Sequence, residues 1–256
     1  MGELHYIAFE DEAADIKDRV ESYWTKRAEG FFELRHDEIE SVKASRWLEE
    51  IKQMLPEGKS LNILDVGCGT GFFEVVLGKE GHRITGIDLT PEMIVKAGEM
   101  ISLYGLDSNK VKVEQGDAEN LHFPDGFFDV VISRNLTWTL PHPIEAYGEW
   151  RRVLKQGGVL INFDAEYAKG AHNLKSPENL AHSKIDDALK DECHNIYHML
   201  TISTLNRPEW DKEILEQIGF ENVSTDSEFG SRIFIEHDEF YIPDKMFCVF
   251  AQKSEL

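Results

Sequence analysis

The sequence predicts an α/β protein with a doubly wound, mainly parallel sheet of seven strands. Short apolar runs alternate with helical patterns from residue 62 to residue 163. A glycine-rich turn follows the first of these runs, and an aspartate lies at or next to the end of each of the first three. Such alternation favours parallel strands joined by right-handed crossover helices.

The stretch over residues 62–73 begins this pattern. Its first half, Asn-Ile-Leu-Asp-Val, is apolar enough for a strand buried on both faces of a parallel sheet. Gly67, Gly69 and Gly71 follow, and glycine lets the backbone turn tightly and lets a ligand approach closely. The next helical pattern places free backbone N–H groups beside the turn, where they attract an anion or carboxylate. Strand, turn and helix together predict a ligand site.

The remaining elements follow in order along the chain. Further strands are expected over residues 84–88, 111–117, 128–133 and 159–163. Helices are expected over about 71–80, from Pro91 to Ile101 with Thr90 as its cap, and from Pro143 to Leu154. A helix over residues 208–218 and strands near 222–228 and 246–252 close the sheet.

Two segments lie outside this alternation. Residues 1–57 carry two helical patterns and are expected to form an N-terminal helical lid on a ligand-binding domain at 58–256. Residues 165–207 are polar, contain histidines and are largely helical in pattern. They are expected to form a cap inserted over the carboxyl edge of the sheet.

The net charge of −21 comes from 48 acidic and 27 basic residues. An acidic surface repels phosphate backbones and anionic membranes, so nucleic acid and membrane are disfavoured as partners. Three widely spaced cysteines favour neither a disulfide framework nor a zinc site. Because there is no signal peptide and no apolar run of about 18 residues, the expected location is the cytoplasm. The expected partner is a small molecule, and no pattern predicts the oligomeric state.

In open α/β sheets, ligands bind outside the carboxyl ends of the strands. Asp65 lies at the first of these ends and suits a cationic amino group. Asp88, 21 residues after Gly67, can accept hydrogen bonds from both hydroxyls of a ribose. Asp117 can accept from an adenine amino group, and the backbone N–H of Ala118 can reach a ring nitrogen. Three acids in this order match an adenosine with an amino-acid tail.

A dinucleotide site is the competing interpretation of the glycine turn. In the pattern G-x-G-x-x-G the third glycine would fall at position 72, which is Phe72. Asp65, directly before the turn, would repel a pyrophosphate. An NAD-dependent oxidoreductase is therefore the less favoured function.

The Asp-x-Gly-x-Gly-x-Gly sequence at 65–71 resembles motif I of the class I S-adenosylmethionine (SAM) methyltransferases. Stretches at 86–93, 116–119, 127–131 and 149–158 resemble successive motifs of the ubiquinone/menaquinone-biosynthesis-like group, although Gln156 replaces a proline usual there. The resemblance implies a Rossmann-like methyltransferase fold, with residues 58–256 as the SAM-binding domain. It also implies SAM as cofactor, S-adenosylhomocysteine as product and a small organic acceptor.

The resemblance further assigns residues to the cofactor. It implies that the three glycines cradle the methionine part, that Asp88 binds the ribose and that Leu89 contacts the adenine. The backbone near Arg134 would face the methionine amino group. The full expected cofactor set is Tyr23, Trp24, Asp65, Gly67, Cys68, Gly69, Gly71, Asp88, Leu89, Asp117, Ala118, Glu119, Arg134, Asn135 and Leu136.

Tyr23 and Trp24, with Arg27 and Ala28, resemble the N-terminal helix that often lids the SAM site in this group. An aromatic ring there can attract the sulfonium by a cation–π interaction. Helical spacing alone predicts that the same two residues belong to a buried core. The sequence supports both interpretations equally.

Methyl transfer from a sulfonium is an in-line displacement, in which orientation supplies about 7–11 kcal/mol. A base is needed only where the acceptor must lose a proton. No catalytic residue is assigned. Candidate bases are His36, His142, His194, His198 and Tyr167. Candidate lining residues of the acceptor pocket are Asn135, Trp138, Asp164, Glu166, Tyr167 and Tyr241.

His194 and His198 lie four residues apart and form a possible metal pair, but no third ligand has a fixed spacing, so no metal site is expected. The fourth strand ends in Arg-Asn-Leu-Thr, unlike the Asn/Asp-Pro-Pro-Tyr/Phe motif of amino-methylases. A small organic acceptor is expected, with O, N, S and C all open as its methylated atom. The alternative in another class is a non-catalytic regulatory protein that binds SAM or S-adenosylhomocysteine.

Overall fold

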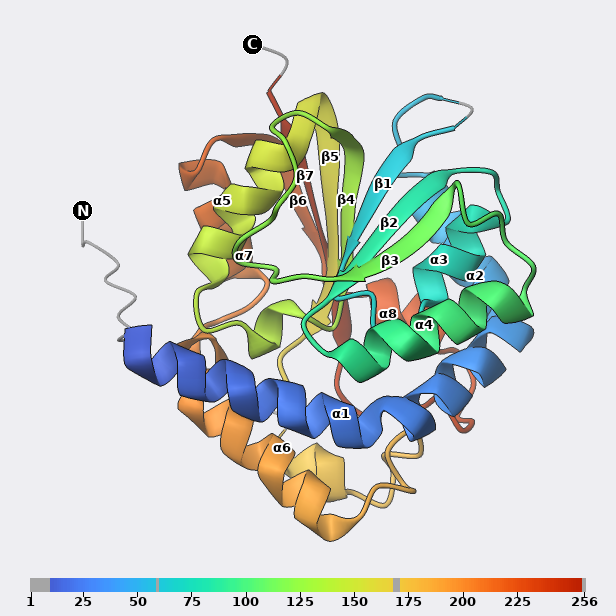
Figure 1. The fold of residues 1–256 in the computed structure, drawn as a ribbon. Coiled ribbons are helices and arrows are strands. Elements are labelled where there is room, and N and C mark those ends of the chain that lie inside the picture. Colours follow the sequence, from blue (N-terminus) through green and yellow to red (C-terminus); the bar gives the residue numbers. More distant parts are fainter. Residues whose placement is uncertain (1–9, 59, 168–170, 255–256) are drawn as a thin grey trace.

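A seven-stranded sheet in the order β3-β2-β1-β4-β5-β7-β6 forms the centre of the fold (Figure 1). The computed structural model describes residues 10–58, 60–167 and 171–254. The strands are β1 Asn62–Val66, β2 Arg83–Asp88, β3 Val111–Gln115, β4 Phe128–Arg134, β5 Leu154–Ala165, β6 Phe220–Asp226 and β7 Met246–Lys253. Neighbours among β1 to β5 are parallel, whereas β7 runs antiparallel to both β5 and β6. The predicted doubly wound, mainly parallel sheet is confirmed.

Helices cover both faces of the sheet and its carboxyl edge (Figure 1). They are α1 Glu10–Glu40, α2 Val42–Lys52, α3 Phe72–Gly78, α4 Pro91–Leu103, α5 Pro143–Val153, α6 Asp187–Met199, α7 Glu209–Gln217 and α8 Phe229–Ile233, with 3-10 turns η1 Thr137–Thr139, η2 Ala171–Lys175 and η3 Thr201–Thr204. α5 and α7 pack on one face, and α2, α3 and α8 on the other. Within the parts of the chain that the structure describes, no helix is long and apolar enough to cross a membrane.

The central strands are mainly apolar because both faces of the sheet are covered. Alternate residues of a strand point to opposite faces. In β1, Ile63 packs with the cluster around α2 and α3, while its neighbour Leu64 packs with the cluster around α5 and α7. In β4, Val130 and Val131 divide in the same way, and all four side chains are fully buried. This explains why the strands lack the polar alternation of a half-exposed sheet.

The strand order reverses between β1 and β4, and this reversal positions the site. β2 and β3 extend the sheet from one side of β1, and the chain then returns to place β4 on the other side. Such a switch point leaves a crevice at the carboxyl ends of the strands. α1 runs across this edge, and α6 lies beside it (Figure 1).

The structure differs from the expected elements in three places. β5 begins at Leu154 rather than at residue 159, because Leu154 already pairs with Phe128 before an irregularity shifts the register. β3 ends at Gln115, and Asp117 instead forms an isolated bridge with Asn120. α8 was not expected, since its five residues are too short to show a helical period.

Candidate active site

A cavity lies at the carboxyl ends of β1, β2 and β4, and residues of α1 and of the described part of the segment at 165–207 also line it. Apolar and aromatic side chains make up most of its lining. Of the residues expected at the cofactor, all but Gly71 and Glu119 line this cavity. Gly71 is the residue before α3 and faces α4, where a Cβ would lie 3.4 Å from Ala97.

The glycine turn after β1 is hydrogen-bonded to the neighbouring strand β2. The backbone N–H groups of Gly67 and Cys68 both donate to the carbonyl oxygen of Ile87, at 2.8 and 2.9 Å. Gly67 has φ 72° and Gly69 has φ 53°, in the left-handed region that favours glycine. A Cβ on Gly67 would lie 2.9 Å from the side chain of Leu136. Only glycine fits at Gly67 without displacing the wall of the cavity.

Asp88, at the end of β2, is fixed by the backbone of the same turn. Its carboxylate accepts hydrogen bonds from the N–H of Gly69 at 3.0 Å and of Thr90 at 2.9 Å. Burial raises the pKa of Asp88, although these two donors act in the opposite direction. The acid is thus held in one orientation at the floor of the cavity.

Asp117 and Glu119 both bind a side chain from α1. Lys17 Nζ lies 2.7 Å from Asp117 and 2.5 Å from Glu119. Glu119 also accepts from the backbone N–H of His142 at 2.6 Å. Lys17 therefore links α1 to the end of the cavity formed after β3.

Asp65 and Glu74 form a buried pair of carboxyl groups behind the turn. Burial raises the pKa of Asp65 to about 8 and raises that of Glu74 well above its ordinary value. In the part of the chain that is described, no N–H or hydroxyl group donates to Asp65 Oδ1 or to either oxygen of Glu74, and a proton held by one acid can bond it to the other. A Cβ on Gly86 would lie 2.2 Å from Glu74 Oε1, so glycine at position 86 makes room for this acid. Of the two acids, Asp65 lines the cavity and can accept from a cation there, whereas Glu74 lies behind it.

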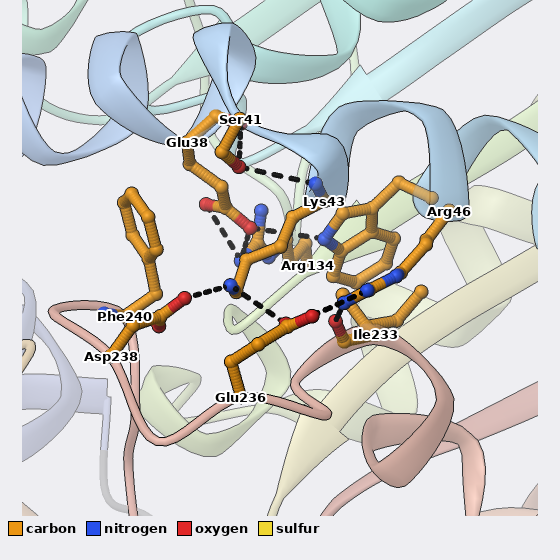
Figure 2. A network of polar contacts seen from close by, with 10 residues as sticks. Glu38, Ser41, Lys43, Arg46, Arg134, Ile233, Glu236, Asp238 and Phe240 are labelled. Atoms are coloured by element: carbon orange, nitrogen blue, oxygen red, sulfur yellow. Dashed lines mark hydrogen bonds and ion pairs between the residues drawn. The ribbon is translucent and has the colours of Figure 1, made fainter.

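Arg134, at the end of β4, forms a buried ion pair with Glu38 of α1 (Figure 2). Its Nη2 lies 2.9 and 3.2 Å from the two Glu38 oxygens, and its guanidinium stacks 4.3 Å from the Trp47 ring. Glu38 is fully buried and also pairs with Arg35. Burial lowers the pKa of Arg134 to about 10, and Arg35 acts in the same direction. Nε and Nη1 of Arg134 are buried without a partner among the described residues.

A second part of this network ties α2 to the C-terminal segment before β7 (Figure 2). The buried ammonium of Lys43 pairs with Asp238 and lies 4.9 Å from the centre of the Phe240 ring. Arg46 pairs with Glu236 at 2.6 Å. Because Phe240 lines the cavity, these ion pairs position part of its wall.

Aromatic side chains from distant parts of the chain enclose the cavity. Tyr23 is buried and Trp24 is partly buried, and both line it from α1. Trp138 meets Tyr167 and Tyr197 at ring-centre distances of 5.5 and 4.4 Å. Tyr23 and Trp24 thus belong to the core and also line the cavity.

The residues expected around the acceptor divide into two groups. Asn135, Trp138 and Tyr167 line the cavity, and the Tyr167 hydroxyl donates to Asn135 Oδ1 at 2.8 Å. Asp164 and Glu166 do not line it, because both bind Arg207: Asp164 pairs with its guanidinium at 2.7 Å and Glu166 accepts from its backbone N–H. Tyr241 lies outside as well, where it stacks on His237.

Among the candidate bases, only Tyr167 lines the cavity. His142 lies 3.1 Å from Glu119, and His36 packs near Tyr104. His194 and His198 face each other at 3.0 Å on α6. In the described ranges, no group of three or more histidine, cysteine, aspartate or glutamate side chains is arranged to hold a metal ion.

Several lining residues were not foreseen from the sequence: Lys17, Phe31, Arg35, His182, Tyr197 and Phe240. They come from α1, the cap and the C-terminal segment, which reach the cavity only through tertiary packing. For Phe31 and Arg35 a signal existed, since they continue the helical face of Tyr23 and Trp24 by whole turns. His182 lies in a turn before α6, where no periodicity marks it.

Known proteins are similar to this chain in the part that contains the glycine turn, Asp65, Asp88 and Asp117. Residues 64–162 match a family described as a methyltransferase domain. A phosphatidylethanolamine N-methyltransferase of Cereibacter sphaeroides is 38% identical over 101 residues, which cover 39% of this chain and 48% of that protein. A demethylmenaquinone methyltransferase of Listeria monocytogenes is 32% identical over 123 residues, covering 46% and 51%. The chain therefore spans about half the length of these curated relatives.

Among solved structures, a phosphoethanolamine N-methyltransferase of Haemonchus contortus, crystallised with S-adenosyl-L-methionine, has the same fold. The TM-score is 0.57 with 17% sequence identity, over 86% of this chain and 60% of that one. At this identity the likeness concerns the fold alone.

Proposed function

We propose that this chain contains a class I SAM-dependent methyltransferase domain and transfers the methyl group of SAM to a small organic acceptor bound in the same cavity. Two relatives are named for acting on a demethylmenaquinone and on phosphatidylethanolamine. These names support an organic molecule, rather than a nucleic acid, as the acceptor.

The single observation that carries the proposal is the buried carboxyl oxygen of Asp65, to which no N–H or hydroxyl group of the described residues donates. A buried acid without such a donor is costly, and the cost is removed when a cation binds to it. The α-ammonium group of SAM supplies such a cation next to the glycine turn. A pyrophosphate would instead meet two acidic side chains, Asp65 and Asp88, which bring it no positive charge.

Other residues of the cavity fit the rest of the cofactor. We assign Asp88 to the ribose hydroxyls, because its carboxylate is oriented by two backbone donors and still lines the cavity. Asp117 and Ala118 lie at the adjoining strand end and are assigned to the adenine edge. Lys17, which now occupies an oxygen of Asp117, would then share this acid with the adenine amino group.

The chain's own residues would orient the reactants and exclude water. When bound, SAM supplies an activated methyl group, whose bond to sulfur breaks towards sulfur as a lone pair of the acceptor bonds to the carbon. Tyr23 and Trp24 would close the cavity from α1, and their ring faces attract positive charge. We assign α1 and the segment at 165–207 the roles of lid and cap. Holding donor and acceptor in line accounts for about 7–11 kcal/mol of the barrier.

A non-catalytic regulatory protein is the second candidate. Such a protein needs a cofactor site but no space beside it. Here the cavity continues beyond the expected cofactor residues to Leu174, Tyr197 and Phe240. This continuation supports an enzyme.

The test begins with calorimetric titration of the purified chain with SAM, S-adenosylhomocysteine and NAD. Binding of the first two, weakened at least about tenfold by Asp88→Ala, is the expected result, because hydrogen bonds to a charged group are lost. Asp187→Ala, on the exposed start of α6, is the matched control and leaves binding unchanged. Binding of NAD without SAM would contradict the proposal.

Transfer is then tested with SAM carrying a deuterated methyl group and a small-molecule extract, with mass spectrometry as the readout. A labelled product is expected. SAM binding without transfer to any component would favour the regulatory protein instead.

A further inference from the structure

The cavity has two ends of opposite charge. The acids Asp65, Asp88 and Asp117 lie at the ends of β1 to β3, where the proposed cofactor binds. Arg35 lines the other end, from α1 and near His182 of the cap. Arg134 lies between the two ends, since its guanidinium is also 4.8 Å from the centre of the Phe72 ring after the glycine turn. In a chain with a net charge of −21, a buried gathering of guanidinium groups is unexpected and calls for a compensating anion.

Glu38 is the carboxylate that both guanidinium groups share. It pairs with Arg134 through two contacts and with Arg35 through Nη1, so neither arginine has it alone. Arg35 Cζ lies 4.6 Å from the centre of the Phe31 ring, which holds the guanidinium at the cavity wall. The buried Nε and Nη1 of Arg134 remain unpaired within the described ranges. Donors of this kind are most stable when they bind an anionic oxygen.

Arg27 and His182 extend the same region. The buried Arg27 donates to the Tyr23 hydroxyl at 3.3 Å, and no carboxylate of the described residues lies within ion-pair distance of it. Burial, with Arg27 and Arg35 nearby, lowers the pKa of His182 to about 3, so its ring is neutral at pH 7. His182 lines the cavity, and its buried Nδ1 has no partner in the described part of the chain.

The positive charges of the buried arginines outnumber the negative charges that Glu38 and the cofactor supply. Arg35 and Arg134, which line the cavity, and Arg27, which does not line it but acts on His182, carry three positive charges against the single negative charge of Glu38. The methionine carboxylate of SAM brings one negative charge, while its ammonium is neutralised by Asp65. One positive charge is left over when S-adenosylhomocysteine is bound, and two when SAM with its sulfonium is bound. The remaining ligand is the acceptor.

We propose that the methyl acceptor is an organic acid, whose anionic oxygen atoms pair with Arg35 and accept a hydrogen bond from His182. This inference rests on the proposed function and narrows its substrate class. The aromatic residues Trp24, Trp138 and Tyr197 form the walls beside this end, so the acid carries an aromatic or other apolar body.

The experiment titrates the full chain, saturated with S-adenosylhomocysteine, with benzoate and phenylacetate and with their neutral amides benzamide and phenylacetamide. Each acid has nearly the shape of its amide, so a difference in Kd reports the charge. At least one acid is expected to bind about tenfold more tightly than its amide. Equal or weaker binding of both acids overturns the proposal.

Three variants test which positively charged side chain causes the preference for the acid over its amide. Arg35→Gln is expected to abolish the preference for the acid, while Arg35→Lys retains part of it because the positive charge stays. Arg232→Gln on α8, which removes an exposed arginine with its own partners Glu50 and Asp226, is the matched control and keeps the full preference. Circular dichroism and unfolding of each variant show that the chain is folded.

Titration of the same variants with S-adenosylhomocysteine alone separates the two proposals. Arg35→Gln is expected to change this affinity by less than about threefold. A loss of tenfold or more, with the acid preference intact, would assign Arg35 to the methionine carboxylate and overturn the inference while leaving the proposed function standing. If the unaltered chain does not bind S-adenosylhomocysteine, the proposed function itself fails.

Discussion

The two ends of the cavity are built in different ways. At the acidic end, β1, the glycine turn and α3 are consecutive in the chain, and the backbone itself supplies most of the hydrogen bonds. At the basic end, Glu38 of α1, Arg134 of β4 and His182 of the cap come from three distant segments. The first is a local structure that the rest of the fold supports, whereas the second exists only when those segments have packed together.

The difference predicts that charge substitutions at the basic end cost the most stability. We expect Glu38→Gln to lower the free energy of unfolding by about 3–5 kcal/mol, because two buried guanidinium groups lose their shared carboxylate. Denaturant unfolding measures this, with the exposed Glu213→Gln on α7 as a control that changes it by less than about 0.5 kcal/mol. A loss below about 1 kcal/mol would mean that the basic end is not held by this ion pair.

A steric substitution probes the acidic end. Gly86→Ala places a methyl group 2.2 Å from Glu74 Oε1 and 2.8 Å from Cys68 Cβ, and we expect a loss of about 1–3 kcal/mol. Gly98→Ala is the matched control: it lies in α4 with no atom within 4 Å of the added Cβ, and is expected to stabilise the chain by about 0.5–1 kcal/mol. If both variants unfold alike, the acidic end tolerates repacking and the comparison fails.

The smallest expected effect is a proton released on cofactor binding. An acid with a raised pKa keeps its proton in the folded chain, so Asp65, at about 8, is mostly protonated at pH 7. Its contribution to folding stability is present below the unfolded pKa of about 4 and falls as the pH rises towards 8. An ammonium group favours the ionised form and so releases up to about one proton.

Calorimetry of S-adenosylhomocysteine binding in buffers of different ionisation enthalpy counts this proton. Asp65→Asn is expected to remove the release at pH 7. Equal proton release by the variant and the unaltered chain would place the titrating group elsewhere.

The sheet and the acidic end could be predicted from the sequence because short, continuous sequence patterns encode both. Asp65, Gly67 and Asp88 lie at strand ends that the apolar runs mark directly. The basic end left no such signal: Arg35 is one of several charged residues on a long helix, and His182 lies in an irregular turn. The roles of Arg35 and His182 depend on the tertiary packing of distant segments, which no local sequence pattern encodes.

Two expectations failed for a related reason. Asp164 and Glu166 follow β5 and were expected near the acceptor, but Arg207, 43 residues after Asp164, pairs with Asp164 and draws both acids away from the cavity. The end of a strand predicts the position of a residue's backbone, but the orientation of its side chain depends on partners that are distant in the sequence.

The pairing of Lys43 with Asp238 bears on how the protein is made. These residues are 195 positions apart, so a ribosome must add most of the chain before the buried ammonium of Lys43 can meet its carboxylate. Until then α1 and α2 contact α3 and α4 but lack their contacts with the C-terminal segment. The strands and glycine turn can assemble during synthesis, and the cavity closes only when the final strand has left the ribosome.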